Sequence, residues 1–246
     1  GGSVEYFPLL QEDNFTLSLS SLYKALENNI DLLILCNPNN PTSTAIQTDE
    51  LRHILSFCKE RNIFIMIDET YVEFVENIAE ITAMPLTDCF DNLIVLRGVS
   101  KFFAAPGLRF GYGVTGNANL LAELDSIKNP WSLNSIGAYA GELLLSDKNY
   151  IQKTHSLISS ERKRICKKLY SLPFIRVYEP AANFILIKIC KNNLTSYDVF
   201  AFAMQKGLMI RDCSTFNGLS GEFIRFCIMN PEDNDKLLDC LKEILR

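Results

Sequence analysis

The stretch RGVSKFFAAPGLRFGYG, residues 97–113, places a lysine at 101 shortly after an apolar run and an arginine eight positions later. The run LIVLR, residues 93–97, is rich in Leu, Ile and Val and leads into polar residues. Runs of this kind are typical of buried strands in parallel sheets. Residues 110–114, FGYGV, predict a further strand whose glycines tolerate close backbone approach. The stretch therefore indicates two strands joined by a loop that carries reactive groups.

Two similar apolar runs lie earlier in the chain, DLLILC at 31–36 and IFIMI at 63–67. Between them, TDELRHILSFCKERN at 48–62 has apolar residues at helical spacing and acidic residues in its first turn, which favours a helix. A strand, a helix and a strand in this order predict a β-α-β unit with a right-handed crossover. We therefore expect an α/β fold around a parallel sheet.

The second half of the chain has a different pattern. Residues 117–172 are helical in periodicity, and the later part contains three strand-like runs separated and closed by helix patterns: FIRVY (174–178), NFILIKI (183–189) and EFIRFCI (222–228). Antiparallel strands covered by helices predict a smaller α+β domain. We expect a large domain over residues 1–150 and a small domain over 151–246. The opening GGSVEYFPL resembles a turn leading into a strand, so we expect further sequence before residue 1.

The composition limits the class of protein. The chain has 246 residues, 48% of them hydrophobic, and a net charge of -5, without a basic run, which argues against nucleic acid or an anionic membrane as partner. No apolar stretch is long enough to span a bilayer. The eight cysteines form no CxxC pair and are interpreted as reduced, mostly buried thiols of a cytoplasmic protein. With only His53 and His155, a metal site or a Ser-His-Asp relay is not expected.

Polar residues follow each of the three parallel runs. In open α/β sheets, ligands bind beyond the carboxyl ends of the strands, so these residues are expected to converge on one crevice. They offer a carboxamide, a carboxylate, a phenol, a hydroxyl, an amine and a guanidinium: Asn40, Asp68, Tyr71, Ser100, Lys101 and Arg109. Together these groups could hold a pyridine ring bearing an aldehyde, a hydroxyl and a phosphate.

Pyridoxal 5'-phosphate is such a molecule, and it acts as an electron sink. Lys101 would form the Schiff base, and Asp68 would keep the ring nitrogen protonated. Asn40 and Tyr71 would bind the phenolic oxygen. The phosphate would be held by a hydroxyl and a guanidinium, those of Ser100 and Arg109. Lys101 must lose its proton to act, which burial and a neighbouring cation would promote.

Three ordered motifs carry a family resemblance: NPNNPT (37–42), IDETYVEF (67–74) and SKFFAAPGLRFGY (100–112). They resemble the motifs of the fold-type I PLP enzymes of the class I/II aminotransferase group, and the resemblance covers essentially the whole chain. It implies a mostly parallel central sheet with helices on both faces, a smaller α+β C-terminal domain, and a homodimer. FIRFCI is similar to the segment whose arginine binds the substrate α-carboxylate, which implies that role for Arg225. Arg211 matches an arginine that members of this group place near the substrate phosphate.

Two branches of this group share all these motifs, the histidinol-phosphate aminotransferases and the L-threonine-O-3-phosphate decarboxylases. NPWSLN (129–134), AANFILIK (181–188) and RDCSTFNGL (211–219) look closer to the decarboxylases, which make the aminopropanol phosphate arm of cobalamin. The resemblance therefore favours decarboxylation of a small phosphorylated amino acid. An aminotransferase is the alternative, and a non-catalytic PLP-fold module, such as a sensor or scaffold, is a further one.

The sequence departs from the family pattern in three places. Ser43 stands where the family usually has glycine, and Gly98 stands where a hydroxyl often assists the phosphate. The amino-terminal part of the pattern is absent, with the loop and helix start that bind the phosphate through backbone amides and the aromatic that stacks on the ring. This last departure favours the non-catalytic alternative.

Overall fold

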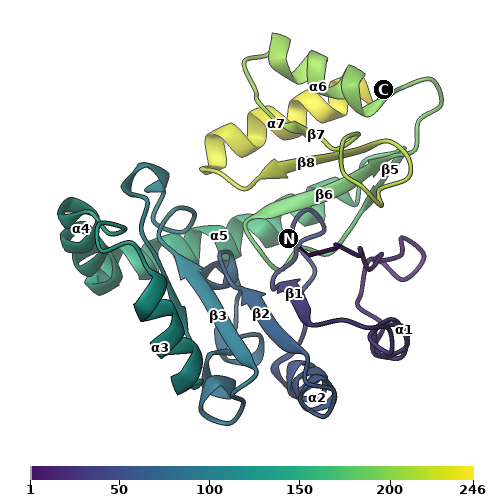
Figure 1. Cartoon of the computed structure of the whole chain (residues 1–246). Coiled ribbons are helices and arrows are strands. Elements are labelled where there is room, and N and C mark those ends of the chain that lie inside the picture. The colour runs from purple at the N-terminus through teal and green to yellow at the C-terminus, as the bar shows by residue number, and fades with distance from the viewer. Residues whose placement is uncertain (1) are drawn as a thin grey trace. The chain divides into compact units, whose positions relative to one another are not determined.

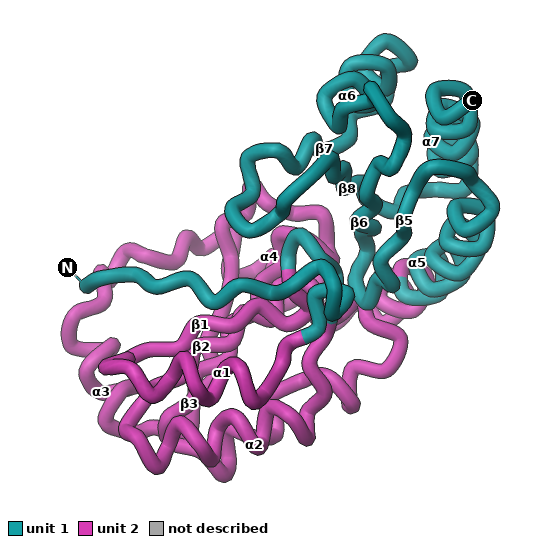
Figure 2. The backbone as a smooth tube through the Cα atoms, turned by 90° about the vertical axis from the view of Figure 1, so that its right-hand side faces the viewer, with its two compact units in different colours: residues 1–16, 40–44, 155–246 teal, residues 17–39, 45–154 magenta. Residues whose placement is uncertain are grey.

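The computed structural model describes residues 2–246, so Gly1, the first residue of the predicted large domain, lies outside the described residues. The chain forms two compact units (Figure 2). Unit 1 comprises residues up to 16, 40–44 and 155–246, and unit 2 comprises 17–39 and 45–154.

Unit 2 is built on a sheet with the strand order β1-β2-β3-β4. The strands are β1 (Leu32–Cys36), β2 (Phe64–Asp68), β3 (Leu93–Gly98) and β4 (Gly111–Val114). The first three are parallel, and β4 runs antiparallel to β3. The predicted strands at 31–36, 63–67, 93–97 and 110–114 are thus confirmed to within a residue at most ends. Parallel pairing brings the carboxyl ends of β1, β2 and β3 to one edge of the sheet (Figure 1).

The helices of unit 2 are amphipathic or locally capped. In α2 (Thr48–Lys59), a capping box between Gln47 and Glu50 satisfies the first backbone amides, and the face with Leu51 and Leu55 is buried. The others are α1 (Leu19–Ala25), α3 (Ala118–Ile127), α4 (Ser135–Ser146) and short 3₁₀ helices at Val72–Phe74, Ile78–Glu80, Met84–Asp88 and Pro106–Leu108. The helix predicted over 48–62 therefore ends a few residues earlier than expected, in a turn that leads into β2.

Side chains alternate in burial along the strands of unit 2. Ile65, Ile67 and Val95 are fully buried on one face of the sheet. On the opposite face of the edge strand β1, Leu32 and Ile34 expose 44% and 58% of their surface. Burying apolar surface stabilises a folded chain by about 25 cal/mol per Å². The covered face is therefore the core of the unit.

Unit 1 contains an antiparallel sheet with the order β5-β6-β8-β7. Its strands are β5 (Ile175–Val177), β6 (Phe184–Ile189), β7 (Arg211–Asp212) and β8 (Phe223–Cys227), and its helices are the end of α5 (Lys148–Leu169), α6 (Ser196–Gln205) and α7 (Pro231–Ile244). One sheet face carries Phe15, Tyr178 and Phe223 in a single cluster with Leu186 and Cys213. The sequence did not predict β7, which has only two residues.

Two segments distant in sequence belong to unit 1. The ring of Phe15 lies 4.9 Å from that of Tyr178, and the backbone oxygen of Ser43 accepts a hydrogen bond from the amide of Ala181. These contacts group residues 40–44 and the amino-terminal segment with 155–246. The units therefore divide the chain differently from the ranges 1–150 and 151–246, which remain a prediction about domains.

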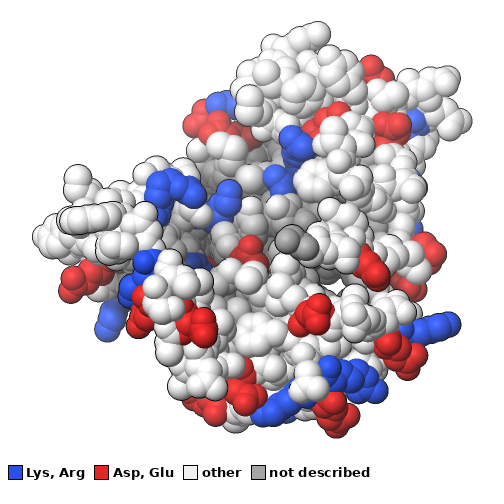
Figure 3. Space-filling model, in the orientation of Figure 1, with Lys and Arg blue, Asp and Glu red and all other residues white. Residues whose placement is uncertain are grey.

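All eight cysteines lie among the described residues and are free thiols. Cys58, Cys166, Cys213 and Cys240 are buried, but Cys36, Cys89, Cys190 and Cys227 are exposed. The expectation that they are mostly buried is therefore wrong for half of them, because three of the exposed ones lie at or just beyond a strand end, where packing stops. Over residues 2–246, no helix is long and apolar enough to cross a membrane. Acidic and basic side chains are interspersed over the face shown in Figure 3.

Candidate functional site

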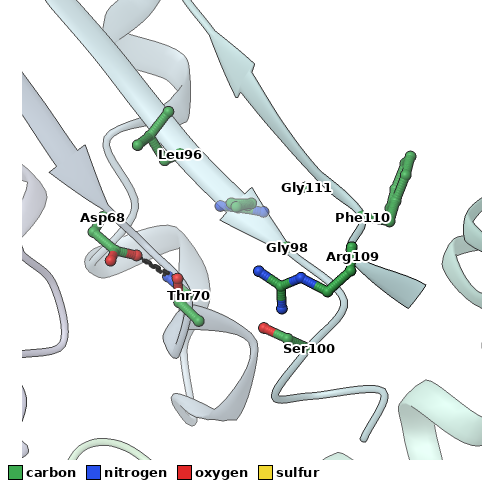
Figure 4. Close-up of a pocket in the computed structure, with 9 residues that line it drawn as sticks. Asp68, Thr70, Leu96, Gly98, Ser100, Arg109, Phe110 and Gly111 are labelled. Atoms are coloured by element: carbon green, nitrogen blue, oxygen red, sulfur yellow. Dashed lines mark hydrogen bonds between the residues drawn. The ribbon is translucent and has the colours of Figure 1, made fainter. Parts of the chain in front are cut away.

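A pocket of about 250 Å³ lies in unit 2, where β2 and β3 end. Its lining combines a carboxylate, hydroxyls and two guanidiniums with glycines and apolar groups (Figure 4). The residues are Asp68, Thr70, Leu96, Arg97, Gly98, Ser100, Arg109, Phe110 and Gly111. Three of the six predicted cofactor residues, Asp68, Ser100 and Arg109, are therefore brought together.

Asp68 is the last residue of β2 and is held by the turn that follows it. Its Oδ1 accepts a hydrogen bond of 2.9 Å from the amide of Thr70 and a second, short one from the Thr70 hydroxyl. This Asx turn fixes the carboxylate and leaves Oδ2 to accept a proton or a hydrogen bond from another group. Cys36 pairs with Asp68 in the sheet. Partial desolvation by the surrounding protein atoms, followed by the Asp68 charge, raises the pKa of the Cys36 thiol.

Ser100 and Arg109 come from the loop that joins β3 to β4. Arg109 adopts a left-handed backbone conformation, with φ of 51°, and its Nη1 donates a 3.1 Å hydrogen bond to the oxygen of Pro106. Figure 4 shows its guanidinium beside the Ser100 hydroxyl, across the pocket from Asp68 and Thr70. Anion-binding donors and a carboxylate therefore face the same cavity from opposite sides.

Tyr71 and Lys101 lie near one another in the same unit. The Nζ of Lys101 is 6.0 Å from the centre of the Tyr71 ring. Lys101 is exposed, so the expected burial of this lysine is wrong. The reason is local: the neighbouring Val99 and Phe102 are buried, and the turn between them directs Lys101 outward.

The other predicted residues lie in unit 1. Arg211 on β7 and Arg225 on β8 are direct partners in the antiparallel register, so both side chains stand on the same face of the sheet. The Nη2 of Arg211 donates a 3.0 Å hydrogen bond to the Thr215 hydroxyl. Within residues 2–246, neither arginine forms an ion pair with a carboxylate. The pair is a concentration of positive charge that could bind anions.

Arg225 is held from two directions. Its guanidinium lies 5.0 Å from the centre of the Phe184 ring, and its Nη1 donates a short hydrogen bond to Oδ1 of Asn40. Its Nε is buried and has no hydrogen-bond acceptor among the described residues. A buried N–H donor without a partner costs free energy, so this atom favours a bound acceptor.

Sequence reasoning missed a buried network next to the pocket. Glu69 follows Asp68, and its carboxylate accepts hydrogen bonds from Arg97, Thr82 and the amide of Ala83. The available signal was an arginine inside an apolar strand run, since a charge at such a position must find a buried partner. The same reasoning also missed Thr70, although an Asp followed two residues later by Thr is a common turn signature.

The sequence and the fold match those of known proteins. The family model for aminotransferase class I and II matches residues 1–241. The chain belongs to the class I and II aminotransferase family. The cofactor of this family is pyridoxal 5'-phosphate. The predicted family and fold class, α/β of PLP fold type I, are thereby confirmed.

Individual relatives fall into both predicted branches. A threonine-phosphate decarboxylase of Salmonella typhimurium is 31% identical over 100% of this chain and 66% of its own length. A histidinol-phosphate aminotransferase of Thermoanaerobacter sp. is 35% identical over 99% of this chain and 66% of its own length. The crystal structure of the histidinol-phosphate aminotransferase from Clostridium acetobutylicum has a TM-score of 0.89 at 32% identity and covers 95% of this chain and 69% of that one. The chain thus spans about two thirds of the length of the curated relatives it matches.

The side chains of unit 2 fit the family's cofactor. The open Oδ2 of Asp68 suits a protonated ring nitrogen, and the Ser100 hydroxyl and Arg109 guanidinium suit a phosphate. The ring nitrogen and the phosphate of the cofactor would thus meet complementary groups on opposite sides of one pocket.

Proposed function

We propose that this chain is the cofactor- and substrate-binding part of a PLP-dependent lyase that decarboxylates L-threonine O-3-phosphate to aminopropanol phosphate, a step of cobalamin biosynthesis. The observation that carries the proposal is the pairing of Arg211 with Arg225 on one sheet face, without carboxylate partners among the described residues. Two adjacent guanidiniums suit a small substrate with both a carboxylate and a phosphate.

Unit 2 supplies the cofactor-binding groups in this proposal. Asp68 holds a proton at the ring nitrogen through its free Oδ2, and Ser100 and Arg109 bind the phosphate. Tyr71 donates a hydrogen bond to the phenolic oxygen of the ring, and Lys101 is the amine that binds the cofactor covalently. When bound, the cofactor accepts the electron pair of the bond that breaks at the substrate α-carbon.

Unit 1 supplies the substrate-binding groups. Arg225 binds the α-carboxylate, and the proposal gives its buried Nε an acceptor. Arg211 binds the substrate phosphate. Asn40 has its Oδ1 occupied by Arg225, which leaves the Nδ2 hydrogens to donate to a ligand. Contacts of this kind orient the substrate, and its orientation decides whether carbon dioxide or a proton leaves.

Histidinol-phosphate aminotransferase activity is the second candidate. It is favoured by the 35% identity to the Thermoanaerobacter enzyme and the TM-score of 0.89 to the Clostridium enzyme. Lys101 would then move the α-proton as the base.

The deciding experiment incubates the chain and pyridoxal 5'-phosphate with threonine phosphate, and separately with histidinol phosphate and 2-oxoglutarate. Release of carbon dioxide in the first mixture supports the decarboxylase. Glutamate formation in the second, without carbon dioxide from the first, overturns that choice in favour of the aminotransferase. Absence of any visible absorption from bound cofactor would instead support a non-catalytic module.

A homodimer and a cytoplasmic location belong to the same proposal. Eight free thiols are consistent with a reducing compartment. Sedimentation that gives only monomer at micromolar concentration would count against the dimer.

A further inference from the structure

We infer that the buried ion pair between Glu69 and Arg97 is a positioning device. It fixes the position of Asp68, along the strand direction, relative to Ser100 and Lys101 at the cofactor pocket. The expected effect on cofactor binding rests on the proposed function. The coupling between the ends of β2 and β3 concerns only the side chains and backbone of unit 2.

The first step is how completely Glu69 is bound. Its side chain is 0% exposed, and that of Arg97 is 15% exposed. Oε2 of Glu69 accepts hydrogen bonds of 2.9 Å and 2.7 Å from Nε and Nη2 of Arg97. The Thr82 hydroxyl also contacts both carboxylate oxygens, and the Ala83 amide donates to Oε1 at 2.5 Å. A buried carboxylate with donors on both oxygens is locked in one orientation.

The second step is what the pair connects. Glu69 directly follows Asp68, and its amide donates a 2.9 Å hydrogen bond to the oxygen of Leu96. Arg97 directly follows Leu96 and precedes the loop that carries Ser100 and Lys101. The pair therefore ties the ends of two neighbouring strands together at the residues from which both functional segments leave the sheet.

The third step is where the pair lies relative to the pocket. Asp68 and Leu96 are partners in the parallel register and line the pocket together. Arg97, the next residue of β3, also lines the pocket, while the side chain of Glu69 is fully buried. Nε and Nη2 of Arg97 are bound to Glu69, so these two donors hold the strand ends and are not left for the cofactor.

A hydrophobic pair could fill this space, but it would not fix the two strand ends along the strand direction. The two donors of Arg97 to one carboxylate oxygen specify a geometry as well as an attraction. A small shift between Asp68 and Ser100 would misplace one end of a rigid ring relative to the other, and small misplacements of this kind are costly to binding and catalysis. Glu69 and Arg97 therefore act through other residues and are not catalytic themselves.

The test compares Glu69→Gln with a matched control, Glu161→Gln. Glu161 is also buried, is ion-paired to Arg164 at 2.7 Å and accepts a hydrogen bond from Asn234, but it lies on α5 in unit 1. Both variants lose one buried charge, so a purely structural role predicts a similar loss of thermal stability and no other difference. A third variant, Arg97→Lys, keeps the charge but loses the two-donor geometry.

The first measurement is hydrogen–deuterium exchange of the cofactor-free full chain. Glu69→Gln is expected to speed exchange in peptides covering both 68–71 and 98–101, while Glu161→Gln leaves both unchanged. Faster exchange in only one of these segments, or in neither, overturns the coupling, and this readout does not depend on cofactor binding.

The second measurement is the dissociation constant for pyridoxal 5'-phosphate, at a temperature where all variants are folded. We expect at least a tenfold increase for Glu69→Gln, a smaller increase for Arg97→Lys, and less than a twofold change for Glu161→Gln. Equal affinities for Glu69→Gln and the unchanged chain overturn the positioning role. If the unchanged chain itself binds no cofactor, the proposed function fails, while the exchange measurement still decides the coupling.

Discussion

Arg225 on β8 donates a hydrogen bond through Nη1 to Oδ1 of Asn40, a residue 185 positions earlier in the chain. An arginine only donates hydrogen bonds, so this contact fixes which end of the Asn40 amide faces it. The contact links the NPNNPT motif to the arginine proposed to bind the substrate carboxylate. Each of these residues thereby constrains the orientation of the other.

Asn40→Asp keeps the acceptor oxygen but adds a negative charge beside Arg225. We expect a stronger local ion pair and a weaker attraction for substrate, with at least a tenfold rise in the dissociation constant for threonine phosphate, which corresponds to about 1.4 kcal/mol. Isothermal titration calorimetry measures this. The control is Asn28→Asp, an exposed position with the same charge change. Equal losses in both variants would contradict the specific role.

Asp68→Asn replaces the free Oδ2 with a donor NH₂ group. The remaining oxygen can still accept from Thr70, so the turn and the fold are expected to persist. Since the amide cannot hold a proton on a ring nitrogen, turnover is expected to fall by about 100-fold or more. Steady-state kinetics check this, with Asp91→Asn as a control at an exposed ion pair with Lys59. Near-normal turnover in Asp68→Asn would refute its assignment.

Lys101→Ala is expected to abolish turnover without loss of stability, because Lys101 is exposed and replacing it leaves no buried cavity. Borohydride reduction of the cofactor-loaded chain, followed by peptide mapping, identifies the lysine that binds the cofactor. The cofactor mass on a peptide with any other lysine would exclude Lys101 from this role. Lys128→Ala, at another exposed lysine, serves as the control.

Ser43 adopts φ of 62°, a left-handed conformation that favours glycine, and it is fully buried. Its Oγ accepts a 2.9 Å hydrogen bond from the amide of Ala182. Ser43→Ala keeps the backbone strain and leaves that amide without a partner, so we expect a loss of about 1–3 kcal/mol in the free energy of unfolding.

Ser43→Gly loses the same hydrogen bond but relieves the strain, by about 1–2 kcal/mol. The glycine variant is therefore expected to be more stable than the alanine variant in urea denaturation. The reverse order would show that the backbone strain at this position is negligible.

Glu73 has a buried Oε2 without a hydrogen-bond partner among residues 2–246. Burial raises the pKa of Glu73 from its usual 4.5 to about 7, and Glu69 adds to this while Arg97 opposes it. Between these pH values the folded chain binds more protons at this site than the unfolded chain does. The stability contributed by Glu73 is therefore fully present below about pH 4.5 and is lost as the pH rises to about 7.

Glu73→Gln should remove this dependence. Its free energy of unfolding is expected to exceed that of the unchanged chain by more at pH 8 than at pH 5. Denaturant titrations at the two pH values measure the difference. A difference that is the same at both would mean that Glu73 does not titrate in this range.

Local sequence determined much of the fold. The apolar runs at 63–67 and 93–97 became β2 and β3 because a buried parallel strand needs apolar side chains on successive residues. The position of the polar groups followed from the same pattern, since parallel strands end at one edge. The sequence therefore places Asp68, Ser100 and Arg109 at one edge of the sheet, where all three line the pocket. The family also followed from the sequence, because three motifs occur in a fixed order.

Tertiary structure decided what depends on residues distant in the chain. The contact between Asn40 and Arg225, the burial of Glu69 against Arg97 and Thr82, and the grouping of residues 40–44 with unit 1 have no local signal. Local patterns report which face of a strand is buried, but they do not report which distant group satisfies a buried charge. The exposure of Lys101 and the two-residue strand β7 depend in the same way on the packing of neighbouring segments, which only the folded chain specifies.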